Sequence, residues 1–318
     1  MTPDRARLVV GLLMAFLWGT SFAAAEEPPR QLRVEAEFPP RGDYMCVGFG
    51  SFWMMSDQKL MRIALADNAV TEIPLNGATG RWRRTVVGEG AVWVADNLSQ
   101  TIYKIDPTTN LVVLAIPAAF PVDNEAAGEI GAGAGAVWAV TGSETDQVLR
   151  RYSPQTGEEQ AAIPLPSPSR DRGIVVDFGS VWVAGMRDEE LYRVDPATDQ
   201  ITATIELHAR PVTLASGEGS VWVRERGGIV QRIDGGSGKL LATVETESVD
   251  RYGEIAVGGG FVWTNNNKVA LLQIDPQTNS LRSRFDAPAG AFIGYTIAYG
   301  GGSLWLGGSA VFRIKPPE

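Results

Sequence analysis

One tryptophan motif recurs seven times along this 318-residue chain and constrains its fold more than any other feature. The motif is a glycine-rich turn followed by a small residue, an aliphatic or aromatic residue and tryptophan, as in Gly88-Glu-Gly-Ala-Val-Trp93. Successive tryptophans lie 40, 45, 44, 40, 41 and 42 residues apart. They are Trp53, Trp93, Trp138, Trp182, Trp222, Trp263 and Trp305. A fixed period of this length indicates an array of equal structural units.

Each unit carries four short strand signals, and the second unit shows them clearly. Residues 84–87, 91–95, 101–105 and 111–116 are rich in β-branched and apolar residues and are separated by turn residues. Four strands in every 40 to 45 residues are the signature of a propeller blade. We therefore predict an all-β, seven-bladed β-propeller with four antiparallel strands per blade. The seven tryptophans are interpreted as inter-blade packing, since equal residues in all blades cannot mark a unique site.

The two ends of the chain predict how the ring closes. The seventh unit stops after Val311–Ile314 and lacks a fourth strand, whereas Gln31–Phe38 resembles the fourth strands of the other units. We expect this N-terminal strand to complete the last blade, which removes an open edge that would invite aggregation. Residues 26–318 then form a single propeller domain.

The first 25 residues have the pattern of a secretory signal peptide. Arg5 and Arg7 precede an apolar run from Leu8 to Trp18, and a run of alanines ends the segment. The apolar run is shorter than the roughly 20 residues needed to span a bilayer. The sequence predicts cleavage between Ala25 and Glu26 and a periplasmic or secreted protein without a transmembrane segment. An uncleaved signal anchor is the alternative.

Charge and composition narrow the function classes. The formal net charge is −9, which argues against a nucleic-acid binder because such proteins are normally basic. Cys46 is the single cysteine and His208 the single histidine, so an internal disulfide and any multi-histidine metal site are excluded. Cys46 falls in an inner strand, where a buried, inert thiol is expected. We expect a monomer.

The repeats resemble those of the YVTN-type propellers. The resemblance lies in Val92-Trp93-Val94-Ala95 followed by Ile102-Tyr103-Lys104-Ile105-Asp106-Pro107, and it extends over essentially the whole mature chain. A neighbouring family with similar repeats, the streptogramin B lyases, implies a magnesium-dependent enzyme that opens a lactone with a histidine near the propeller mouth. The positions here that match this histidine, ten before each tryptophan, are Asp43, Arg83, Gly128, Arg172, Val212, Gly253 and Tyr295. None of them is histidine.

Residues that break the seven-fold repeat are the candidates for a binding site. In a propeller, the connections that follow the fourth and second strands of each blade gather at one mouth of the central channel. The predicted mouth carries eleven arginines and no lysine, which suits bidentate recognition of an anion, with aromatic rings able to stack on a ligand. The candidate ligand-binding residues are Tyr44, Trp82, Arg83, Arg84, Arg172, Arg210, Arg251, Tyr252 and Tyr295. The alternative is a solvated, salt-bridged rim, because only 5 of the 28 basic residues of the chain are lysine.

Catalytic and metal-binding candidates are few. His208 is a candidate for proton transfer at the mouth. Glu129 and Glu254, each nine residues before a tryptophan, are candidates to bind Mg or Ca or to form an ion pair with Arg84. No other cofactor is expected. The recurring Asp106, Asp195, Asp234 and Asp275 are interpreted as turn formers.

Three functional hypotheses follow. The first is an exported, non-catalytic propeller that binds a small anionic ligand or an envelope protein at the channel mouth. The second is a lyase-like enzyme that depends on a divalent metal. The third is an assembly platform in an envelope complex.

Overall fold

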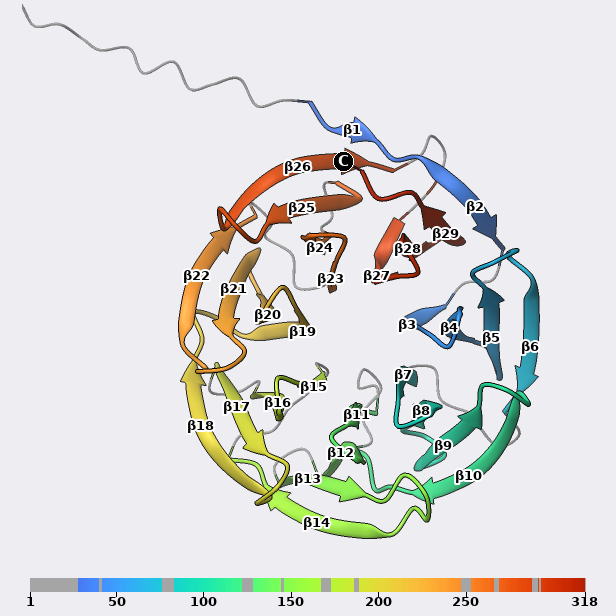
Figure 1. The fold of residues 1–318 in the computed structure, drawn as a ribbon, viewed down its shortest axis with the longest axis vertical. Helices are drawn as coiled ribbons and strands as arrows, with labels where there is room; N and C mark the ends of the chain where they lie inside the picture. The colour runs from blue at the N-terminus through green and yellow to red at the C-terminus, as the bar shows by residue number, and fades with distance from the viewer. Residues whose placement is uncertain are drawn as a thin grey trace, which may run out of the picture.

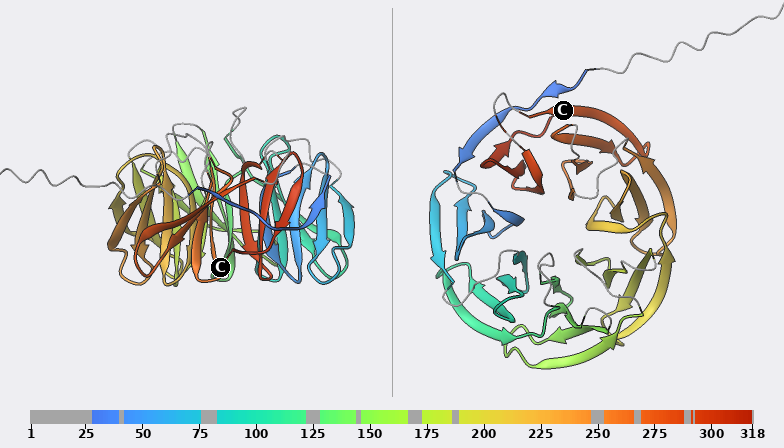
Figure 2. Two further views of the ribbon diagram at one scale, coloured as in Figure 1. Left: turned by 90° about the horizontal axis from the view of Figure 1, so that it is seen from above. Right: turned by 180° about the vertical axis from the view of Figure 1, so that it is seen from behind.

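The computed structural model describes residues 28–39, 42–75, 83–121, 128–143, 146–166, 173–185, 189–246, 253–265, 269–287, 291 and 293–317, with the backbone alone for Asp43 and Tyr295. These residues form seven sheets arranged around a central axis as a flat disc (Figures 1 and 2). The predicted seven-bladed β-propeller is confirmed. Among the residues that are described, no helix is long and apolar enough to cross a membrane.

The four strands of each blade run outward from the axis in chain order. Blade 1 comprises β3 (Asp43–Gly48), β4 (Ser51–Ser56), β5 (Lys59–Ala64) and β6 (Val70–Pro74). Blade 2 comprises β7 (Arg83–Gly88), β8 (Ala91–Asp96), β9 (Thr101–Asp106) and β10 (Leu111–Pro117). Blade 3 comprises β11 (Ile130–Gly133), β12 (Ala136–Gly142), β13 (Gln147–Tyr152) and β14 (Glu159–Pro164). Blade 4 comprises β15 (Ile174–Asp177), β16 (Ser180–Gly185), β17 (Glu190–Asp195) and β18 (Gln200–Glu206).

The remaining blades follow the same plan until the chain ends. Blade 5 comprises β19 (Pro211–Gly217), β20 (Ser220–Glu225), β21 (Ile229–Asp234) and β22 (Leu240–Glu245). Blade 6 comprises β23 (Ile255–Gly258), β24 (Phe261–Thr264), β25 (Leu271–Asp275) and β26 (Ser280–Asp286). Blade 7 comprises β27 (Ile293–Gly300), β28 (Ser303–Gly308) and β29 (Val311–Ile314), and its outer strand is β2 (Val34–Phe38) from the N-terminus.

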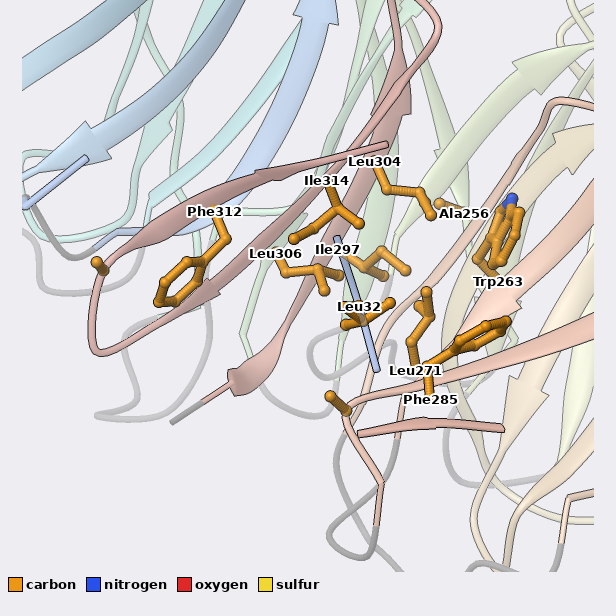
Figure 3. Close-up of a cluster of buried hydrophobic side chains, with 12 residues drawn as sticks. Leu32, Ala256, Trp263, Leu271, Phe285, Ile297, Leu304, Leu306, Phe312 and Ile314 are labelled. Carbon is orange, nitrogen blue, oxygen red and sulfur yellow. The ribbon is translucent and has the colours of Figure 1, made fainter. Parts of the chain in front are cut away.

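The N-terminal segment closes the ring in two pieces. The strand β2 pairs antiparallel with β29, as expected, with Glu37 opposite Phe312. The expected single strand over 31–38 is wrong in its first part, because β1 (Arg30–Gln31) instead pairs in parallel with the outer strand of blade 6. Leu32 separates the two strands, and its side chain, 6% exposed, packs between blades 6 and 7 against Leu271, Phe285 and Ile314 (Figure 3). Burial of this leucine explains the break.

The repeated tryptophans are fully buried and hold neighbouring blades together. Each has an exposed fraction of 0% and lies in a hydrophobic cluster. In blades 1 to 6 the indole Nε1–H donates to the carbonyl oxygen of the residue five positions earlier, as Trp93 does to Gly88 at 3.0 Å. The hydrogen bond satisfies the one polar atom of a large apolar side chain. The predicted inter-blade packing role is confirmed.

A cationic side chain lies across each of six tryptophans and reaches the next blade. These residues sit directly opposite the tryptophan on the third strand: Arg62, Lys104, Arg151, Arg193, Arg232 and Arg313. Each covers its indole ring, and each donates to a carbonyl oxygen in the outer turn of the following blade. Blade 6 uses Gln273, whose amide donates to Pro317 at 3.3 Å. We call this series the inter-blade clasp.

The recurring aspartates form the outer turns, as predicted. Asp106 accepts a hydrogen bond from the backbone N–H of Thr108 at 2.7 Å, and Asp195, Asp234 and Asp275 accept equivalent bonds. Hydrogen bonds to the ionised carboxylate lower the pKa of Asp106, Asp195 and Asp234. The main donors are backbone N–H groups of the turn for Asp106 and Asp195, and the Ser237 hydroxyl for Asp234.

Candidate functional site

The structure joins three of the predicted residues at the channel mouth of blades 1 to 3. Tyr44, Arg84 and Glu129 each lie nine residues before the tryptophan of their blade. The guanidinium of Arg84 lies over the Tyr44 ring at 4.7 Å, and its Nε is 3.4 Å from Oε2 of Glu129. Oε2 of Glu129 in turn accepts the backbone N–H of Gly173 in blade 4. We call Tyr44, Arg84 and Glu129 the mouth cluster.

The backbone of the inner strands sets up this cluster. Tyr44 has a φ of +53°, in the left-handed region that a bulky side chain rarely adopts. The pairing of β3 with β4 shifts at this point, between Asp43 and Cys46. In blade 2 the strand is regular, and Arg84 pairs with Ala95. The irregular turn at Tyr44 therefore places its ring beneath a guanidinium carried by the regular strand beside it.

Within the mouth cluster, the anionic side chain is buried more deeply than the cationic one. The Glu129 side chain is 4% exposed and that of Arg84 is 16% exposed. A carboxylate this deeply buried must be balanced by a cation or by hydrogen-bond donors, and Arg84 and Gly173 supply both. The side chain of the pair that is more open to solvent is Arg84, whose guanidinium stacks on an aromatic face.

Arg83 is turned into the seam between blades 1 and 2. Its side chain is 6% exposed, its Nε is 3.8 Å from Oδ2 of Asp96, and it donates to the carbonyl oxygen of Asp57. Burial lowers the pKa of Arg83, and the charge of Asp96 opposes this shift. Arg83 thus connects blade 2 to blade 1 through its hydrogen bond to Asp57, while its buried ion pair with Asp96 lies within blade 2. The sequence had suggested a ligand-binding role for this arginine.

The two glutamates proposed for metal binding each bind the backbone of the following blade. Oε2 of Glu254 accepts the N–H of Ile297 at 3.2 Å, and Glu129 binds Gly173 in the same manner. Within the described part of the chain, no group of three or more histidine, cysteine, aspartate or glutamate residues is placed to hold a metal ion. Glu129 and Glu254 thus each use a carboxylate oxygen on the backbone of the next blade, and their role in binding Mg or Ca stays a prediction.

His208 lies exposed on the connection between blades 4 and 5, and the backbone of this loop is firmly held. The N–H of His208 donates to Oε1 of Gln231 at 3.3 Å, and the N–H of Ala209 donates to Oε2 of Glu225 at 2.6 Å. Arg210 is also exposed, and its carbonyl oxygen accepts a hydrogen bond from the backbone N–H of Arg226 at 2.9 Å. The loop presents both side chains to solvent from a fixed backbone.

Glu225 is a buried acid that the sequence analysis missed. The residue is 0% exposed, and its Oε1 has no hydrogen-bond partner among the described residues. Burial, with a smaller contribution from Glu189, raises its pKa to about 8. A charged residue three positions after the tryptophan, on a strand that is otherwise buried, was the available signal.

Trp82, Arg172, Arg251 and Tyr252 lie outside the described residues, and of Tyr295 only the backbone in β27 is described.

The surroundings of Cys46 disfavour its thiolate form. It packs in the cluster around Trp53 and Val94, and burial raises its pKa to about 12. Because the thiolate is the nucleophile, a thiol with this pKa is unreactive near neutrality.

Comparison with known proteins supports the fold at low sequence identity. The sequence matches no protein-family model and no curated protein. Among solved structures, virginiamycin B lyase from Staphylococcus aureus superposes with a TM-score of 0.74 and 16% identity over 90% of this chain and 100% of that one. BamB from Moraxella catarrhalis superposes with a TM-score of 0.60 and 13% identity over 86% and 84% of the two chains. The chain is thus a seven-bladed β-propeller with structural likeness to an enzyme and to BamB.

Proposed function

We propose that this protein is a non-catalytic binding propeller that recognises an anionic group at the channel mouth of blades 1 to 3. The group is the carboxylate of a small molecule or of an acidic side chain on an envelope protein. The observation that carries the proposal is the fixed guanidinium of Arg84, held between the Tyr44 ring and the Glu129 carboxylate. A guanidinium fork suits an oxyanion, and a side chain held in place before binding loses less entropy when it binds.

Export of the chain belongs to the same proposal. The basic start, short apolar run and alanine exit of the first 25 residues support a signal peptide cleaved before Glu26. The mature protein would then meet its ligand in the periplasm or outside the cell, as a monomer without a cofactor.

The experiment compares two arginines that both stack on aromatic rings. Thermal-shift measurements would use a panel of mono-, di- and tricarboxylates, inorganic phosphate and a tetraglutamate peptide. We expect one class of anion to raise the melting temperature of the wild type and to lose this effect in Arg84→Gln. Arg282→Gln is the matched control, because Arg282 lies 4.8 Å from the Phe261 ring in blade 6, on an outer strand. The proposal is wrong if no anion shifts the melting temperature, or if Arg84→Gln retains the shift.

The likeness to virginiamycin B lyase favours one alternative, a divalent-metal-dependent lyase. The carboxylates of Glu129 and Glu254 bind the backbone of neighbouring blades, and the Arg84 guanidinium is held in place on an aromatic ring, which together favour binding as the function. Turnover of a cyclic lactone substrate that is abolished both by a chelator and by His208→Ala would establish the enzyme instead.

A further inference from the structure

The outer strand of blade 2 carries a row of exposed apolar side chains. Along β10 the row consists of Leu111, Val112, Val113, Ala115 and Pro117, all exposed, whereas Ile116 is buried in the blade stack. Leu111 is 61% exposed and Val113 is 52% exposed. Figure 1 shows β10 on the circumference of the disc, far from the channel mouth. We call these five residues the β10 row.

The corresponding row of every other blade includes a charge. A bulge at the same point of the outer strand in blades 2 to 7 makes the positions comparable. Charged residues on or next to the outer strands of the other blades include Glu72, Glu158, Glu206, Lys239, Glu245, Arg282, Glu35 and Glu37. Charges on edge strands prevent pairing with other chains. The β10 row is the one that lacks this protection.

The outer edge of this propeller can accept an additional strand, and the chain itself provides the example. In blade 6 the outer strand β26 is covered by β1, with Arg30 opposite Phe285 and Gln31 opposite Asp286. In blade 2 the sheet ends at β10, in the order β10-β9-β8-β7 among the described strands. The same kind of edge is therefore open in blade 2 and bordered by apolar side chains.

We propose that β10 binds an extended apolar segment of a partner protein, which adds to blade 2 as a fifth strand. In this mode the main chain provides the hydrogen bonds, and alternate side chains provide specificity. The β10 row is apolar at every position, and three of its residues follow one another around the bulge, so the partner segment is expected to carry several apolar residues. This surface is separate from the channel mouth and goes beyond the anion-binding function.

The size of the row argues against a second copy of this chain as the occupant. The strand has seven residues, which span about 23 Å at ~3.3 Å per residue. A strip of that length and one strand wide, about 10 Å, offers about 230 Å², well below the roughly 800 Å² that each partner buries in a stable complex. A short peptide segment, stabilised by main-chain pairing, fits a strip of this size.

The experiment uses a labelled peptide and variants at matched positions on two blades. The probe is a peptide of about twelve residues that alternates valine and threonine with lysines at its ends, followed by fluorescence anisotropy with the mature chain. We expect the double variant Leu111→Lys with Val113→Lys to bind it about tenfold more weakly. The control, Gln200→Lys with Thr202→Lys, changes equivalent exposed positions of β18 and is expected to bind as the wild type does.

Hydrogen exchange provides a second readout that does not depend on the variants. Peptide binding is expected to slow amide exchange in β10 and in no other outer strand. Absence of binding, equal binding by both double variants, or slowed exchange elsewhere would refute the proposal. A concentration-dependent dimer abolished by the β10 variant would assign the surface to self-association and overturn it as well. Arg84→Gln is expected to leave peptide binding unchanged, so this test and the test of the channel mouth fail independently.

Discussion

Blade 3 lacks a hydrogen bond that four other blades make, and restoring it is expected to stabilise the protein. In blades 1, 4, 5 and 7 the Nε of the clasp arginine donates to a serine that begins the second strand, as Arg193 does to Ser180 at 2.8 Å. Blade 3 has Ala136 at this position, and the Nε of Arg151 is buried without a hydrogen-bond partner among the described residues. The change Ala136→Ser supplies the missing acceptor.

The expected gain follows from the charge and burial of the donor. A hydrogen bond to a charged group contributes about 1.5–3 kcal/mol net. Fixing the new hydroxyl costs part of this, so we expect Ala136→Ser to raise the free energy of unfolding by about 1–2 kcal/mol. For a domain of this size, that gain raises the melting temperature by about 2–6 °C. The other contacts of Arg151, with Pro196, Asp199 and the Trp138 ring, remain in place.

The matched control is Ala91→Ser in blade 2. Its clasp residue is Lys104, which has no Nε and whose ammonium already donates to Pro154 at 2.7 Å. The new hydroxyl there has no equivalent donor, so no gain is expected. Melting temperature and urea denaturation of both variants decide the matter. If Ala136→Ser is no more stable than Ala91→Ser, the reasoning about the clasp is refuted.

Two further predictions concern buried acids. Burial raises the pKa of Glu225 to about 8, so its cost to stability is absent near pH 4, grows as the pH rises from about 4.5 to about 8, and is then constant at a few kcal/mol. Glu225→Gln is expected to remove this loss, so the melting temperature of the variant should fall less between pH 5 and pH 9 than that of the wild type. An equal change of melting temperature in the wild type and the variant would contradict this. Glu129→Gln leaves Arg84 without its anion and is expected to cost about 2–4 kcal/mol in urea denaturation. Glu159→Gln, which breaks an exposed pair, is expected to cost under about 1 kcal/mol, and equal losses would refute the difference.

The fold was predictable because it is written in a repeat. The seven tryptophans, the turn aspartates and the missing outer strand of blade 7 each follow from local sequence, and the structure confirms them. The clasp residues escaped notice because they lie 8 to 13 positions after their tryptophans, with connections of variable length between. Counted back from the outer turn the spacing is constant, since Lys104 and Arg193 both lie two residues before the turn aspartate.

The candidate site was predictable only in part, for a physical reason. Sequence placed Arg83 and Arg84 together at the mouth, but adjacent residues of a strand point to opposite faces. Arg84 therefore joins Tyr44, whereas Arg83 enters the seam beside Asp96. The spacing before the tryptophans predicted the ion pair of Arg84 with Glu129, and the structure confirms it. The placement of Arg83 in the seam depended on the register of β7 with β8, which the sequence pattern did not reveal. The break at Leu32 was hidden for a similar reason, because its burial depends on two blades distant in sequence.

Hydrogen exchange on the native chain tests the closure of the ring most directly. The account predicts that the amides of residues 34–38 and 311–314 are protected to the same degree as those of the outer and third strands of blade 4, because β2 and β29 pair as β18 and β17 do. Exchange of residues 34–38 at the rate of an unfolded peptide, while the blades themselves stay protected, would contradict it.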